Sequence, residues 1–126
     1  MLREAYPNLK KPILMIPVGD VLFELDRRAK AGKVPGLKGV EELYVDGIHF
    51  NNVGAFVVGT TFYATMFKKD PTGADFRPYG PGTKQKLDQP ITQELAAAVQ
   101  RTVWDVVSRH PYSGIGKAQP ANAARR

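Results

Sequence analysis

The chain has 126 residues, of which 43% are hydrophobic and 24% charged, with a net charge of +6 and no cysteine. This length suits one small domain, and the lack of cysteine excludes disulfides, zinc–thiolate sites and thiol nucleophiles. The basic excess is spread along the chain and partly lies at Arg125 and Arg126, so no nucleic-acid partner is predicted.

The N-terminal third of the chain predicts a strand followed by a helix. The opening MLREAYPNLKKP lacks the apolar core of a signal peptide, and the cellular compartment of the protein is not determined by the sequence. Residues 13–16 form a short apolar run between two prolines, which is typical of a buried strand in a parallel sheet. From residue 18 to about residue 31 apolar residues recur at helical spacing, and Gly32 is a suitable helix stop.

A second strand and a second helix are expected next. EELYVDG, residues 41–47, predicts a short strand or extended segment, and Asn51 or Asn52 is suited to cap the following helix. That helix should run to about Phe67 and is apolar nearly all round, so we expect cover on more than one side. Residues 47–67 carry no lysine, arginine, aspartate or glutamate, but the purely apolar part of this region is shorter than the ~20 residues that a membrane span needs. No membrane partner is therefore predicted.

The C-terminal third predicts a loop, a helix and a tail. Residues 70–90 are rich in proline and glycine and predict a surface loop. A last helix is expected over about residues 91–109, with the chain from Pro111 onward frayed. The buried stripe of that helix would be Leu95, Val99, Val103 and Val106. The order of elements predicts an α/β fold that looks like the end of a doubly wound domain, with one incomplete domain over residues 1–114 and a flexible tail over residues 115–126.

Asp46 and His49 are the candidate catalytic pair. They lie where an apolar segment meets a helix start, and in open α/β sheets that edge is where sites form. A carboxylate at this spacing can accept a hydrogen bond from Nδ1 of His49, which leaves Nε2 to take a proton from a nucleophile. The alternative is that Asp46 only caps the turn while His49 packs on the helix. A metal site would need more ligands, and the second histidine, His110, is far along the chain, so no metal and no cofactor are predicted.

The segment LYVDGIHFNNVG resembles the last conserved block of the SGNH (GDSL-type) hydrolase superfamily, in which Asp-x-x-His lies between the last strand and a helix. The flanking ILMIPVGDVLFEL, AGKVPGLKGVEELYVDGIHF and ELAAAVQRTVWDVVSRHPYSG resemble neighbouring elements, so the likeness covers most of residues 12–114. It implies the C-terminal strands and helices of a partial flavodoxin-like doubly wound (SGNH-type) domain. It also implies Asp46 as triad acid, His49 as general base, and a small-molecule or carbohydrate ester as substrate.

The serine nucleophile and oxyanion blocks of that family are not found in this chain. Gly19 and Asp20 mimic the start of Gly-Asp-Ser, but Val21 follows them and has no nucleophilic group. The only serines are Ser108, in the last predicted helix, and Ser113, in the predicted tail.

Thr60 and Thr61 lie in the middle of a predicted helix, where packing or hydrogen bonding to the preceding turn explains their hydroxyls. Without a nucleophile the chain by itself should be a poor esterase, because losing one triad member lowers the rate ~10⁴- to 10⁶-fold. Two hypotheses remain. The chain is the C-terminal fragment of an SGNH-type esterase that needs a missing N-terminal segment, or it is a non-catalytic interaction module that forms a homo-oligomer.

Overall fold

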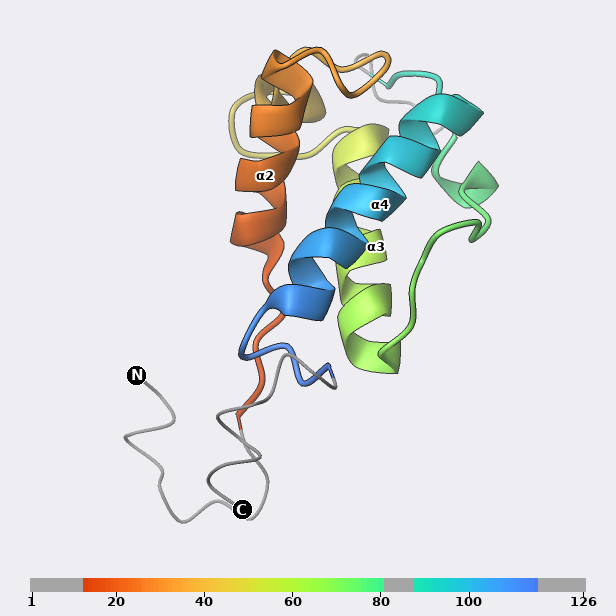
Figure 1. Ribbon diagram of the computed structural model, residues 1–126. Coiled ribbons are helices and arrows are strands. Elements are labelled where there is room, and N and C mark those ends of the chain that lie inside the picture. Colours follow the sequence, from red (N-terminus) through yellow and green to blue (C-terminus); the bar gives the residue numbers. More distant parts are fainter. Residues whose placement is uncertain (1–12, 81–87, 116–126) are drawn as a thin grey trace.

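The computed structural model describes residues 13–80 and 88–115, and three α-helices make up about half of this part (Figure 1). They are α2 (Val18–Lys30), α3 (Asn52–Phe67) and α4 (Gln93–Arg109). Two short 3₁₀ helices, η1 (Val40–Leu43) and η2 (Arg77–Tyr79), lie in the connections. Each α-helix packs on the other two around one apolar core, and Figure 1 shows α4 crossing diagonally in front of α3, with α2 to the left.

The first predicted helix is confirmed as α2. Val21, Leu25 and Ala29 recur every fourth residue and are buried, so this face of α2 forms part of the core. Gly32 ends the helix with a φ of +76°, a left-handed conformation that glycine adopts without steric penalty. In this closing turn the amide of Lys33 donates a hydrogen bond to the carbonyl oxygen of Arg28 at 2.9 Å.

The second predicted helix is confirmed as α3, with Asn51 as its N-cap. The Asn51 side chain accepts a hydrogen bond from the amide of Gly54 at 3.0 Å. Val53, Phe56 and Val57 are buried, and α3 contacts α2, α4, η1 and η2. The expectation of cover on more than one side is confirmed by these four elements, but one stripe of α3 is exposed. Its exposed members are Ala55, Phe62, Tyr63, Met66 and Phe67.

The last predicted helix is confirmed as α4, which begins after the N-cap Thr92. Leu95, Val99 and Val103 are buried as expected, whereas Val106 is half-buried. The prediction of a frayed chain from Pro111 is wrong for the residues just after α4. The Ser113 side chain is fully buried and donates hydrogen bonds to the carbonyl oxygens of Val107 (2.6 Å) and His110 (3.1 Å), which satisfies the end of the helix.

The predicted α/β fold, a partial flavodoxin-like doubly wound (SGNH-type) domain, is wrong for the part of the chain that the structure describes. Residues 13–17 have no regular secondary structure and pair with no described strand, and the amide of Met15 donates a hydrogen bond to the carbonyl oxygen of Tyr112 at 2.7 Å. Residues 41–47 contain the end of η1 and a tight loop, and the β pairing within residues 13–80 and 88–115 is one isolated bridge between Tyr44 and Phe50. An apolar run becomes a strand only beside another strand, because its backbone groups need partners there.

The proline- and glycine-rich region is partly described. Residues 70–80 contain η2, and the ring of Tyr79 packs 5.5 Å from that of Phe56. Residues 81–87 and the predicted tail beyond Ile115 lie outside the described residues. Among the described helices, none is long and apolar enough to cross a membrane.

Candidate functional site

Asp46 and His49 are in direct contact. Nδ1 of His49 lies 2.7 Å from Oδ2 of Asp46, while Oδ1 of Asp46 accepts hydrogen bonds from the backbone amides of Ile48 (2.9 Å) and His49 (2.8 Å). The backbone amide of His49, its ring and the amide of Ile48 hold the pKa of Asp46 well below its usual range. Because the ionised carboxylate can only accept, Nδ1 carries the proton, and Nε2 of the neutral ring is left as a proton acceptor.

A tight loop between η1 and α3 positions the pair. Its base is the bridge between Tyr44 and Phe50, whose rings stack with centroids 4.7 Å apart. Inside it, the amide of Val45 donates to the carbonyl oxygen of His49 at 2.8 Å. Gly47 turns the chain with a φ of +108°, a conformation that side chains disfavour.

The loop is seated on the first turn of α3. The amide of Asn51 donates to the carbonyl oxygen of Leu43 at 2.8 Å, so the N-cap residue also closes the loop. Gly54 allows the close approach, because a Cβ there would lie 2.6 Å from that same carbonyl oxygen and 2.5 Å from the ring of Phe50. A short local sequence therefore fixes both the turn and its attachment to the helix.

The pair is open to solvent. The His49 side chain is 73% exposed and that of Asp46 is 56% exposed. The alternative in which His49 packs on the helix is therefore wrong, whereas its other half, Asp46 capping the turn, is confirmed by the two backbone amides. Capping and orienting are done by the two oxygens of one carboxylate. Catalysis by the pair stays a prediction.

The hydroxyl groups considered as nucleophiles have other roles. Ser113 is buried at the end of α4, and Thr61 donates to the carbonyl oxygen of Val57 at 2.8 Å, which confirms the expected bond to the preceding turn. Ser108 lies within α4, and Thr60 is buried within α3. No hydroxyl in the described part of the chain forms a hydrogen bond with His49.

A second histidine–aspartate pair was not predicted. Nε2 of His110 lies 2.9 Å from Oδ2 of Asp20, and the amide of Tyr112 donates to Nδ1 of His110 at 3.1 Å. The ring therefore accepts at Nδ1 and donates at Nε2, the reverse of His49. This pair joins the start of α2 to the end of α4, and the His110 side chain is only 13% exposed. The partners are far apart in sequence, so only the helix packing brings them together.

Asn52 was considered only as a possible helix cap, but its main role is a long-range contact. Its amide nitrogen donates to the carbonyl oxygens of Tyr79 (2.8 Å) and Gln89 (2.6 Å), and its oxygen accepts the amide of Gln89 at 2.8 Å. Asn52 thus ties α3 to the two described ends of the proline- and glycine-rich loop. An asparagine in an apolar helix is the only sequence signal for it.

Within residues 13–80 and 88–115, no three side chains of histidine, aspartate or glutamate come together as a metal site would need. No family model, no curated protein and no solved structure matches this chain. The SGNH resemblance and a hydrolase activity therefore remain predictions that depend on the sequence likeness alone, and the α/β architecture that came with them is replaced by the helical fold described above.

Proposed function

We propose that Asp46 and His49 are the acid and the general base of a Ser-His-Asp ester-hydrolysing site whose serine comes from a polypeptide segment other than the described residues. The observation that carries this proposal is the 2.7 Å contact between Nδ1 of His49 and an ionised Asp46, with the ring 73% exposed. An oriented ring with an accessible Nε2 is what a serine hydroxyl needs as its proton acceptor.

The reaction would use the two residues in turn. His49 Nε2 takes the serine proton as the serine oxygen bonds to the acyl carbon, and Asp46 stabilises the imidazolium. The same proton then passes to the alcohol oxygen as the ester C–O bond breaks. Water then gives a proton to His49 and bonds to the acyl carbon, the bond from that carbon to the serine oxygen breaks, and His49 returns the proton to the serine oxygen as the acid leaves. The substrate class is an acyl ester of a small molecule or a carbohydrate.

The decisive experiment compares this chain with the product of the same reading frame extended upstream. Hydrolysis of p-nitrophenyl acetate by this chain alone should be barely above the rate in water. The extended protein should react with a fluorophosphonate at a serine and cleave the ester. In it, His49→Ala should lower kcat ~10⁴- to 10⁶-fold, and Asp46→Asn ~10⁴-fold.

Ile48 supplies the matched control. It lies between the two residues, and its side chain is 79% exposed, so Ile48→Ala removes side chain from the same loop without touching the pair. Its activity should stay within about twofold of the parent, since exposed substitutions change little. Serine-dependent cleavage at enzymatic rates by this chain alone, or full activity of His49→Ala in the extended protein, would contradict the proposal.

The second candidate function is a non-catalytic module that associates with a second copy of itself. The exposed stripe of α3 favours it, because Met66 and Phe67 are 63% and 64% exposed and Phe62 is 42% exposed. Contiguous apolar surface of this kind marks interaction sites. Sedimentation velocity over a concentration series should then show a dimer that Met66→Lys abolishes and His49→Ala leaves intact. A monomer at every concentration rules this function out.

A further inference from the structure

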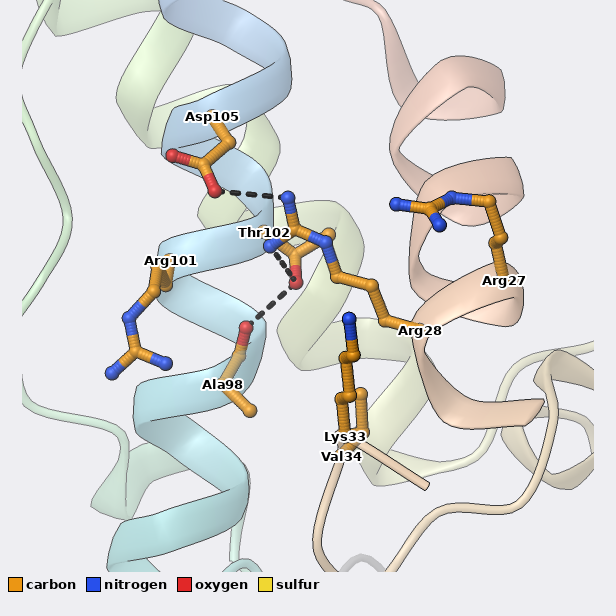
Figure 2. A pocket seen from close by; sticks show the side chains of 8 residues that line it. All are labelled: Arg27, Arg28, Lys33, Val34, Ala98, Arg101, Thr102 and Asp105. Carbon is orange, nitrogen blue, oxygen red and sulfur yellow. Dashed lines mark hydrogen bonds and ion pairs between the residues drawn. The ribbon is translucent and has the colours of Figure 1, made fainter. Parts of the chain in front are cut away.

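A hollow of about 300 Å³ lies between α2 and α4 (Figure 2), and no residue of the Asp46–His49 loop lines it. Val34 and Ala98, both buried, form its apolar floor. Its size is at the lower end of pockets that hold small molecules. Its charged lining comes from both helices and the turn after α2, and comprises Arg27, Arg28, Lys33, Arg101 and Asp105.

Arg28 is held in place at the centre of this lining. Its Nε donates to Glu24 at 2.7 Å, one terminal nitrogen donates to the hydroxyl of Thr102 at 3.2 Å, and the other donates to Asp105 at 2.9 Å. A guanidinium group has five N–H donors, so two of them remain for a ligand. Since the group is already ordered by three contacts from two helices, little side-chain entropy is lost when a ligand binds to it.

The side chains of Lys33 and Arg101 differ from that of Arg28 because neither forms a hydrogen bond or an ion pair with any residue in the described part of the chain. The turn at Gly32 fixes the backbone of Lys33 beside Arg28. Arg101 lies three residues after Ala98 and four before Asp105, on the face of α4 that lines the hollow. Figure 2 shows the Lys33 amine pointing toward Arg28, whereas the guanidinium of Arg101 extends from α4 away from both of them.

The charges at the hollow leave an excess of two. The lining has four cations and one carboxylate, a sum of +3, and Glu24, which binds both Arg27 and Arg28, reduces it to +2. The two uncompensated charges are those of Lys33 and Arg101. A phosphate monoester carries about −1.5 to −2 at pH 7, and its oxygens match fixed guanidinium donors.

We propose that this hollow binds the phosphate group of a small molecule, either inorganic phosphate or a phosphate monoester, through Lys33 and the two remaining donors of Arg28, while Arg101 adds positive charge at its edge. The ligand is small because the site is one hollow with an apolar floor, rather than the extended basic track that a nucleic-acid backbone needs. The proposal does not depend on the Asp46–His49 pair.

Calorimetric titration of the full chain tests it, with inorganic phosphate and glycerol phosphate as probes. Lys33→Gln should weaken binding about five- to tenfold, which corresponds to about 1–1.4 kcal/mol, and Arg101→Gln, which acts by charge from the edge, about two- to fivefold. Both variants should melt within a few degrees of the parent, because neither side chain has a described partner to lose. The matched control is Arg109→Gln, which removes the same charge from the same helix outside the lining and should change binding less than twofold.

The outcomes separate the possible explanations. Tighter binding of glycerol phosphate identifies a monoester resting on the apolar floor, whereas equal binding identifies the phosphate ion, and each supports the site. Equal weakening by Arg109→Gln would show an effect of net charge only and would overturn the proposal. The absence of measurable binding of either probe would also overturn it. So would much tighter binding of a single-stranded oligonucleotide if Arg109→Gln weakened that binding as much as Lys33→Gln does. His49→Ala should leave phosphate binding unchanged.

Discussion

Replacing Asn52 tests how the described ends of the proline- and glycine-rich loop are held to α3. The side chain is 4% exposed and makes two hydrogen bonds with the backbone of Gln89 and one with Tyr79. Its amide therefore pairs with the Gln89 peptide as a neighbouring strand would. Asn52→Ala leaves two carbonyl oxygens and one N–H without this partner.

The size of the effect follows from those three bonds. At about 1 kcal/mol for each unsatisfied group, Asn52→Ala should lower the free energy of unfolding by about 3 kcal/mol. For a domain of this size that corresponds to a Tm lower by about 12–24 °C. It is also a large fraction of the about 5–15 kcal/mol that stabilises a typical domain. Thermal melting followed by circular dichroism measures the change.

Asn52→Asp distinguishes hydrogen bonding from simple packing. It keeps the shape but puts a carboxylate against the carbonyl oxygens of Tyr79 and Gln89, so at pH 7 it should be at least as destabilising as Asn52→Ala. Its folded-state pKa should be raised above the unfolded value of about 3.9, because the protonated acid can donate there. Stability of this variant relative to Asn52→Ala should therefore rise as the pH falls through the raised pKa. Equal stability of both variants at every pH, within about 0.5 kcal/mol of the parent, would refute this explanation.

Two further predictions concern α2 and the loop. Hydrogen bonds from Arg27 and then Arg28 lower the pKa of Glu24 from 4.5 to about 2, so the carboxylate stabilises the fold above pH 4.5 and this contribution is lost as the pH falls toward 2. Glu24→Gln should therefore lower the free energy of unfolding by about 0.5–1 kcal/mol at pH 7, with no loss at pH 2, as urea titrations at the two pH values can check. Gly54→Ala should lower the free energy of unfolding by about 1–3 kcal/mol, because its Cβ would meet the Leu43 carbonyl oxygen and the Phe50 ring. Gly19→Ala is the control, since no atom lies within 4 Å of a Cβ there, and it should be neutral or stabilising in the same urea titration.

The sequence by itself determined the features that depend on neighbouring residues. The helical spacing of apolar residues and the stop at Gly32 defined α2, and the amide cap of Asn51 defined the start of α3. The contact between Asp46 and His49 was predictable for the same reason. Both residues belong to one turn, so the carboxylate reaches the ring whatever the rest of the chain does.

The tertiary structure alone decided the features that need a distant partner. Residues 13–16 have the composition of a buried strand, but a strand exists only when another pairs with it, and no described strand does so. The spacing of apolar residues in α2 does not show what packs against its charged residues. Packing against α4 brings Arg28 to Asp105 and creates the basic hollow, and the same packing brings Asp20 to His110. Spacing along one helix says which residues share a face, but the element that covers this face is chosen by the packing of the whole chain.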